Sequence, residues 1–325
     1  MGTRLAARLM FLFLALLLVF SASVSGCGRK QEGGPLPETP SPAQLSATRV
    51  PNLDLDVYIY IRQERPTTVP GDMIQTPAST EVVSLSAWGL VTGETFTFGL
   101  GLLMASPEDA RKLHAAITPP ANGWKMLSGN LVFYVQGTGG AFESLKNAIS
   151  NGNFKYFDDK KVLDAVATLP AGGNAKLAGV AVAKPHKELV KLLAKGDSKE
   201  AGSLDGILTL ARLEVMVAGL YSPQQIDLAK VRRALNAGNL SEVEVGLVAL
   251  VQSGLPGFIV EPIVKRAIAG AEFTETRLGD LTVYQRDLAV GGKPLPLLAR
   301  VNGSRLWVAV SPQKPYTETL ISGVK

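Results

Sequence analysis

Alternating apolar and polar positions mark the first clear element of the chain. From Leu53 to Arg62 every second residue is aliphatic, and the positions between them hold Asp, Tyr and Arg. Since successive strand side chains point to opposite faces, the pattern predicts a strand with one core face and one partly wet face. The Pro- and Thr-rich segment from Gln63 to Ser79 is expected to be a loop.

Short turn signals predict antiparallel strands elsewhere in the chain. Gly129-Asn130, Gly279-Asp280 and Asn302-Gly303 each separate apolar or alternating runs, as is typical of β-hairpins. With a further turn at Gly291-Gly292, residues 273–310 are predicted to form an antiparallel meander of about four strands. The sheet is therefore expected to be largely antiparallel.

A second junction recurs where an apolar strand ends and a helical pattern begins. Pro stands at the predicted first helical position, where its missing amide costs no hydrogen bond, and Ser can cap the free amides. The four occurrences are Ala105-Ser106-Pro107-Glu108, Ala183-Lys184-Pro185-His186, Tyr221-Ser222-Pro223-Gln224 and Val310-Ser311-Pro312-Gln313.

The order of these elements repeats along the chain. Residues 98–106 align without a gap with residues 245–253, and residues 131–149 align with residues 306–324. The second alignment sets Leu145 against Leu320 and Glu143 against Glu318. The sequence thus predicts an α+β fold with largely antiparallel sheets and packed helices, in two similar halves in tandem. The expected halves are residues 50–200 and 201–325.

The N-terminal residues form a different pattern. Arg4 and Arg8 precede an apolar run from Met10 to Phe20 and then small residues, as in a secretory signal peptide. The following Val24-Ser25-Gly26-Cys27 resembles the cleavage region of a bacterial lipoprotein precursor. The resemblance implies that residues 1–26 are removed and that Cys27 carries a diacylglycerol on its thiol and an acyl chain on its amino group. An uncleaved anchor is the alternative, and both interpretations place the rest of the chain outside the cytoplasm.

Residues 27–49 are predicted to be the lipidated Cys and a linker rich in Pro and Gly. If extended, residues 28–46 would span up to about 60 Å at about 3.1 Å per residue. In the lipoprotein family an Asp after the Cys retains the protein in the inner membrane. Gly28 stands here, which is compatible with the outer membrane of a two-membrane organism. The alternating elements beyond the linker faintly resemble uncharacterised two-repeat domains of membrane-anchored extracytoplasmic bacterial proteins.

Composition limits the chemistry available to the protein. The chain has 325 residues, of which 46% are hydrophobic and 19% charged, with a single Cys and two His. One Cys forms no internal disulfide or Cys-cluster metal site, and two His leave little for a His-based metal or acid–base centre. Removal of residues 1–26, with their two Arg and no acid, lowers the net charge of +5 by two, which is too small an excess to imply nucleic acid. We therefore expect no metal and no cofactor.

The individual candidates for chemistry are weak. His114 lies at helical spacing with Ala110, Leu113 and Ile117, which predicts a core or partly buried position. His186 begins a basic helix and is expected at the surface. Asp54 and Asp56 fit either a carboxylate pair or an exposed sheet face.

Two other polar segments have simple structural explanations. Asp158 and Asp159 stand where a helix dipole favours negative charge. The run from Gly137 to Gly140 could cradle a phosphate, but a tight turn between strand and helix explains it equally well.

Two predicted helices carry patterns that bear on binding. On the helix from Pro185 to Ala194 a stripe of basic side chains could contact anionic lipid headgroups, although a solvated helix face is the simpler interpretation. The stripe consists of Lys184, Lys187, Lys191 and Lys195. The helix from Gly257 to Ala269 is unusually apolar, which fits a helix sandwiched in the core or the wall of a lipid cavity.

These observations favour a non-catalytic, membrane-anchored extracytoplasmic lipoprotein that binds another envelope component, either protein or lipid. A carrier of a hydrophobic, lipid-like ligand is the first alternative, because a chain rich in Leu, Val and Ile could wall a cavity. An enzyme that uses carboxylates alone is the second alternative.

Overall fold

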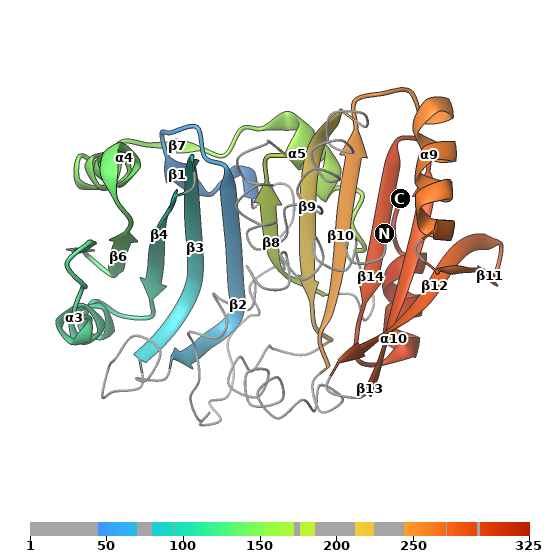
Figure 1. Cartoon of the computed structure of the whole chain (residues 1–325). Helices are drawn as coiled ribbons and strands as arrows, with labels where there is room; N and C mark the ends of the chain where they lie inside the picture. Colours follow the sequence, from blue (N-terminus) through green and yellow to red (C-terminus); the bar gives the residue numbers. More distant parts are fainter. Residues whose placement is uncertain are drawn as a thin grey trace.

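A computed structural model describes residues 45–69, 80–93, 95–171, 176–185, 212–223, 244–270, 272–290 and 293–325. In this part the protein is a mixed α+β fold built on a broad antiparallel sheet (Figure 1). Twelve strands join in the order β11-β12-β13-β14-β10-β9-β8-β2-β3-β4-β6-β5, and β1 pairs with β7 in a separate small sheet. The prediction of a largely antiparallel α+β fold is confirmed.

The strands of the large sheet come from the whole length of the described chain. The first group is β2 (Val57–Val69), β3 (Thr80–Thr92), β4 (Thr95–Met104), β5 (Gly123–Ser128) and β6 (Leu131–Gln136). The second group is β8 (Leu177–Ala183), β9 (Leu213–Tyr221), β10 (Gly246–Ser253), β11 (Thr274–Leu278), β12 (Leu281–Val290), β13 (Lys293–Asn302) and β14 (Arg305–Val310). The small sheet is β1 (Arg49–Pro51) and β7 (Phe154–Tyr156).

The described helices pack on both faces of the large sheet. They are α3 (Pro107–Ala116), α4 (Gly139–Ser150), α5 (Lys160–Val166), α9 (Gly257–Gly270) and α10 (Lys314–Ser322). Buried residues of α4, α5 and α10 share one core cluster with Tyr58, Trp88 and Trp307 of the sheet. On the opposite face α3 packs on β4 and β6, and α9 packs on β13 and β14. The two helices of this second face thus lie at opposite ends of the sheet (Figure 1).

The expectation of a half-wet first strand is wrong. Ile59 is buried in the cluster of one face, and Tyr58, 2% exposed, is buried in the cluster of the other. The Tyr58 hydroxyl and the Thr48 Oγ1 are 2.9 Å apart, so the phenol is both buried and hydrogen-bonded, and burial raises its pKa. Both faces of β2 are therefore core.

The expected loop from Gln63 to Ser79 is also partly wrong. Strand β2 continues to Val69 and β3 begins at Thr80, with the register of their pairing broken between Arg62 and Thr67. Pro66 lies within that break, where its missing amide removes no ladder bond. Residues 70–79 lie outside the described part.

The turn signals and the Ser-Pro junctions are confirmed where they fall in described residues, with one exception. Gly129, Gly279 and Gly303 all have positive φ at hairpin turns, and β11 to β14 form the predicted meander. The Ser106 Oγ accepts a 3.1 Å hydrogen bond from the Asp109 amide at the start of α3. Helix α10 instead begins at Lys314. The Ser311 Oγ accepts a hydrogen bond from the Gln313 amide, and Pro312 lies in the turn that this bond closes. The helices expected after Pro185 and Pro223 lie outside the described residues.

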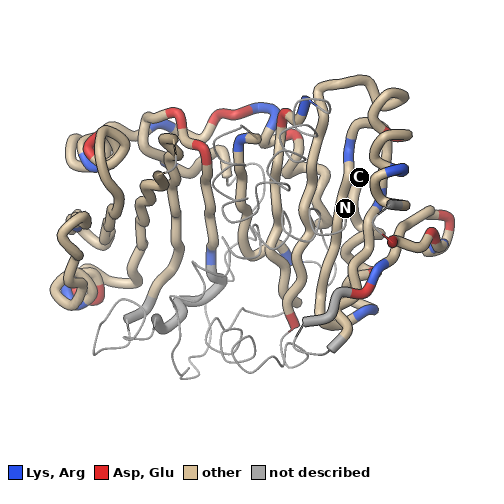
Figure 2. The backbone as a smooth tube through the Cα atoms, in the orientation of Figure 1, with Lys and Arg blue, Asp and Glu red and all other residues tan. Residues whose placement is uncertain are grey.

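Charged residues avoid the middle of the sheet. Lys, Arg, Asp and Glu gather at strand ends, on the helices and in the β11–β12 hairpin (Figure 2). This distribution agrees with a sheet buried on both faces, because an unpaired buried charge is costly.

Candidate functional site

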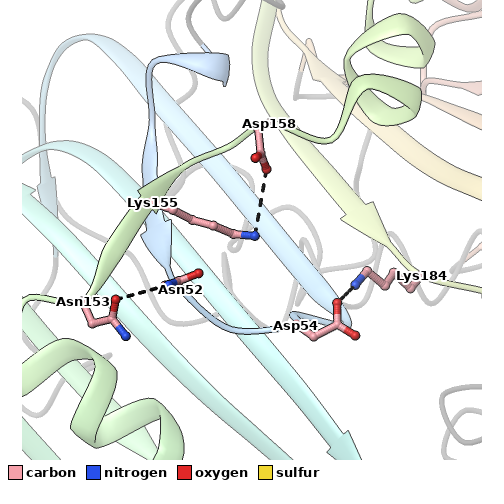
Figure 3. A network of polar contacts seen from close by, with 6 residues as sticks. All are labelled: Asn52, Asp54, Asn153, Lys155, Asp158 and Lys184. Carbon is pink, nitrogen blue, oxygen red and sulfur yellow. Dashed lines mark hydrogen bonds and ion pairs between the residues drawn. The ribbon is translucent and has the colours of Figure 1, made fainter.

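Of the basic stripe predicted from the sequence, the structure describes one residue, Lys184. The Lys184 ammonium, at the end of β8, forms an ion pair with the Asp54 Oδ1 (Figure 3). The Asp54 side chain is 91% exposed, so this pair lies in water and contributes little to stability. Lys187, Lys191 and Lys195, together with His186, lie outside the described residues.

A group of polar contacts surrounds this ion pair where the two sheets meet. The Asn52 Nδ2 donates to the Asn153 Oδ1 at 3.3 Å, and Lys155 lies 3.9 Å from Asp158 (Figure 3). The Asn pair links the segment before β2 to the residue before β7, and the Lys155–Asp158 pair joins β7 to the residues that follow it. These contacts fix the small sheet beside β2, and among the residues drawn they do not bring two carboxylates together.

The two Asp residues considered as a carboxylate pair have separate structural partners. The Asp56 Oδ2 accepts a 2.7 Å hydrogen bond from the Val91 amide, while Asp54 pairs with Lys184. Asp159 lies at the start of α5, where the helix dipole was expected to favour negative charge, and its Oδ1 also caps the helix by accepting a 3.1 Å hydrogen bond from the Val162 amide. The positions of these carboxylates are thus explained by folding.

His114 occupies the predicted helix but not its most buried side. Ala110, Leu113 and Ile117 form the buried side of α3, whereas His114 is half-buried. Desolvation lowers the pKa of His114, and the nearby Lys125 ammonium lowers it further.

The Gly-rich turn before α4 is explained by close packing and backbone shape. A Cβ on Gly137 would lie 2.3 Å from the Thr97 Oγ1, and Gly139 has a φ of +69°. Both positions therefore need Gly for structural reasons. Thr97 is 1% exposed, and its hydroxyl has no hydrogen-bond partner in the described part of the chain.

The apolar helix α9 is neither sandwiched nor the wall of an enclosed cavity. Val260 and Ile268 are buried, and Ile268 packs with Tyr284 and Ala299 of the sheet. On the other side Phe258 is 79% exposed and Ile263 is 52% exposed. The sequence pattern indicated an apolar helix correctly, but it gave no signal that one side would face solvent.

The charged residues of α9 lie in its middle turns. The Lys265 ammonium lies 2.7 Å from the Glu261 Oε1, and the Glu261 Oε2 accepts a hydrogen bond from the Gly303 amide. The hydrogen bond from Lys265 is the main cause that lowers the pKa of Glu261. Arg266 is exposed and forms no ion pair among the residues that the structure describes.

A depression of about 520 Å³ lies beside α10. Its lining is small or polar on most sides, which differs from the aliphatic wall of a lipid cavity. The residues are Pro170, Ala171, Pro315, Glu318, Thr319, Ser322 and Gly323.

Two kinds of site are absent from the described residues. No helix there is long and apolar enough to cross a membrane. No cluster of three or more His, Cys, Asp or Glu in that part is placed to hold a metal ion.

Comparison with known proteins adds little. No protein family matches the chain, and no curated protein matches it. A crystal structure of TP0453 is 11% identical over 85% of this chain and 98% of that one, with a TM-score of 0.37. An N-terminal dehydratase from the difficidin assembly line is 9% identical over 84% of this chain and 83% of that one, with a TM-score of 0.13.

Proposed function

We propose that this protein is a non-catalytic lipoprotein, anchored outside the cytoplasm through lipid on Cys27, whose folded domain binds another component of the envelope. The observation that carries the anchor is the sequence from Val24 to Cys27 behind a charged and then apolar leader. The first described core residue is Leu45, 1% exposed, so the Pro-rich chain after Cys27 precedes the fold and separates it from the anchor. The anchoring membrane is the cell membrane or, because Gly28 and not Asp follows the Cys, the outer membrane of a two-membrane organism.

The experiment for the anchor is a Cys27→Ala substitution in cells fed radiolabelled palmitate. We expect the wild-type chain to incorporate label and to run as the shorter, processed form. The variant should incorporate none and remain an unprocessed precursor. A matched Ser25→Ala variant keeps a small residue before the Cys and should be labelled normally. Label in the Cys27→Ala protein would contradict the proposal.

The binding role is supported by the exposed apolar side of α9 and by the structural partners of the acidic residues. Asp54, Asp56 and Asp159 are engaged by Lys184 and by two backbone amides. An exposed apolar patch on a folded domain usually marks an interaction site. The proposal keeps the basic stripe that begins at Lys184 as a surface for anionic lipid headgroups, although Lys184 itself pairs with Asp54.

The alternative of a carrier for a lipid-like ligand has a direct test. Native mass spectrometry of the protein purified from membranes should show the mass of the lipidated chain alone. A second, non-covalent lipid that survives purification would favour the carrier over the proposed function. The small and polar lining of the depression beside α10 favours the first outcome.

The two-halves arrangement is proposed as the basis of the fold. It is supported by the strand order, in which β2-β3-β4-β6-β5 and β8-β9-β10-β14-β13-β12-β11 run outwards from the β2–β8 pair. In each group a helix on one face follows the third strand, and a helix on the other face follows the next strands, which are the β5–β6 hairpin in the first group and the β11 to β14 meander in the second. On this pairing the second half begins before β8, earlier than residue 201.

A further inference from the structure

The two sides of α9 are both apolar, and only one of them packs against the protein. Residues four apart lie on the same side of a helix. Val260, Val264 and Ile268 therefore form one side, which packs on β13 and β14. Phe258, Ile259, Pro262 and Ile263 form the other, which we call the outer side of α9.

The outer side is exposed far beyond what folding requires. Phe258, Ile259 and Ile263 are 79%, 40% and 52% exposed, and Pro262 between them is also exposed. Tyr156, on the small sheet, is the other large apolar residue exposed to this degree in the described chain. Such a row on one helix is typical of a surface that is covered in the working protein.

Basic side chains border this apolar row. Arg266 follows Pro262 by four residues and so lies on the outer side, and Lys265 lies at its margin. Both are exposed, and the single carboxylate of α9, Glu261, is held by Lys265 and the Gly303 amide. Aromatic and aliphatic side chains on one side with Lys and Arg beside them are what an anionic bilayer surface binds.

The tether allows α9 to reach the membrane that would hold Cys27. The Thr48 Oγ1 donates to the Leu45 carbonyl oxygen and lies 2.9 Å from the Tyr58 hydroxyl of β2, so the fold begins near β2. In the sheet order five strand-to-strand steps separate β2 from β13, or roughly 24 Å at about 4.8 Å per step. The seventeen residues from 28 to 44 would span up to about 53 Å when extended at about 3.1 Å per residue, which exceeds this distance. An anchored domain also faces the bilayer at high local concentration, so a modest apolar row suffices.

We propose that the outer side of α9 docks on the anionic phospholipid surface of the membrane. Phe258, Ile259 and Ile263 enter the boundary between headgroups and acyl chains, while Arg266 and Lys265 contact lipid phosphates. The inference rests on the proposed lipid anchor, and it adds a second contact that sets the orientation of the domain on the membrane. We favour a bilayer over a protein partner because an apolar row with Arg and Lys beside it is complementary to any anionic bilayer surface, whereas a protein partner would need a groove of matching shape.

The test places an environment-sensitive fluorophore on α9 in the full-length protein. Cys27 is the only Cys of the chain, and in the anchored protein its sulfur carries lipid. An Ile263→Cys variant therefore offers one free thiol, and Tyr156→Cys, 59% exposed on β7, is the matched control. Each protein is purified from membranes in detergent, labelled, and reconstituted into vesicles of phosphatidylcholine with phosphatidylglycerol whose acyl chains are brominated.

We expect the label at position 263 to shift to the blue and to lose at least about half of its emission to the brominated chains. The label at position 156 should keep the emission of a label in water. The substitution Arg266→Gln, in the Ile263→Cys protein, should weaken the quenching at the same lipid concentration, with an affinity loss of about fivefold.

The outcomes separate the two proposals. Protein that floats with vesicles but shows equal, unquenched emission at 263 and 156 overturns the docking of α9 and leaves the anchor intact. Protein without acyl chains by mass spectrometry overturns the anchor; the same protein with Cys27→Ser, which again has one thiol, supports α9 if its label at 263 is still quenched. A blue shift at 263 without quenching by bromine indicates a protein, such as a second copy, over α9, and also overturns the membrane proposal. Protein that does not float overturns both.

Discussion

The Lys125 ammonium on β5 lies 2.6 Å from the backbone carbonyl oxygen of His114 and 2.7 Å from that of Ile117. These carbonyls belong to the last turn of α3 and its C-cap, where the helix leaves its oxygens without internal partners. One side chain from the sheet edge thus caps the helix above it. The positive charge also lies at the negative end of the helix dipole.

Replacing Lys125 by Met should lower the free energy of unfolding by about 1–3 kcal/mol, because two carbonyl oxygens lose a charged donor while the aliphatic stem is kept. Chemical denaturation of the purified protein measures the change. Lys112→Met is the control, because the Lys112–Glu108 pair is exposed to solvent and its loss should leave the free energy of unfolding nearly unchanged. Equal effects of the two substitutions would contradict the capping role.

The His114 imidazole should titrate below the ordinary His pKa of about 6.5, because desolvation and then Lys125 disfavour its charged form. A His whose folded pKa is depressed takes up its proton first in the unfolded chain. Stability is therefore retained above pH of about 6.5 and falls as the pH drops through the folded pKa. NMR of the two imidazoles, assigned with His186→Gln, measures the pKa values.

Two further variants test the causes of that shift. Lys125→Met should raise the pKa of His114 only part of the way, since desolvation remains. His114→Gln should flatten the decline of stability below pH 6.5 or so. A His114 pKa at or above the ordinary value would contradict the proposed effects of desolvation and of Lys125.

Local patterns in the sequence were enough to predict several features of this structure. Gly129, Gly279 and Gly303 supply the positive φ of three hairpins, and Ser106 and Asp159 cap helices through their own side chains. Each of these features depends on residues within about four positions of one another, so a single sequence is enough to predict it.

Features set by distant parts of the chain could not be predicted in the same way. The polar groups of Tyr58 and Tyr60 suggested a wet strand face, but neighbouring elements cover that face and Thr48 satisfies the Tyr58 hydroxyl. The β2–β8 pair joins segments more than a hundred residues apart. For α9, the sequence indicated an unusually apolar helix, but it did not show that only the side with Val260, Val264 and Ile268 would pack against the sheet.

Thr97→Val should stabilise the protein or leave its stability unchanged, with an expected gain of up to about 1 kcal/mol. The Thr97 hydroxyl is buried and has no partner among the described residues, so a methyl group of the same shape removes the cost of desolvating it. Gly137→Ala should destabilise strongly, because its Cβ would lie within 2.7 Å of three Thr97 side-chain atoms. Thermal melts compare both variants with the wild type, and a loss of stability in Thr97→Val would indicate a hydrogen bond at that hydroxyl.

Leu145→Ala on α4 and Leu320→Ala on α10 should destabilise the protein by similar amounts, about 2–5 kcal/mol each. The sequence alignment sets these leucines against each other, and both are 0% exposed in the same core cluster. The neighbouring pair Glu143 and Glu318 serves as the control, because each forms at most a partly exposed ion pair with a lysine of its own helix. Glu143→Gln and Glu318→Gln should therefore change stability by less than about 0.5 kcal/mol. Denaturant unfolding of the four variants measures the comparison. If the two leucines differ by more than about 2 kcal/mol, the helices do not hold equivalent places and the two-halves arrangement loses its support.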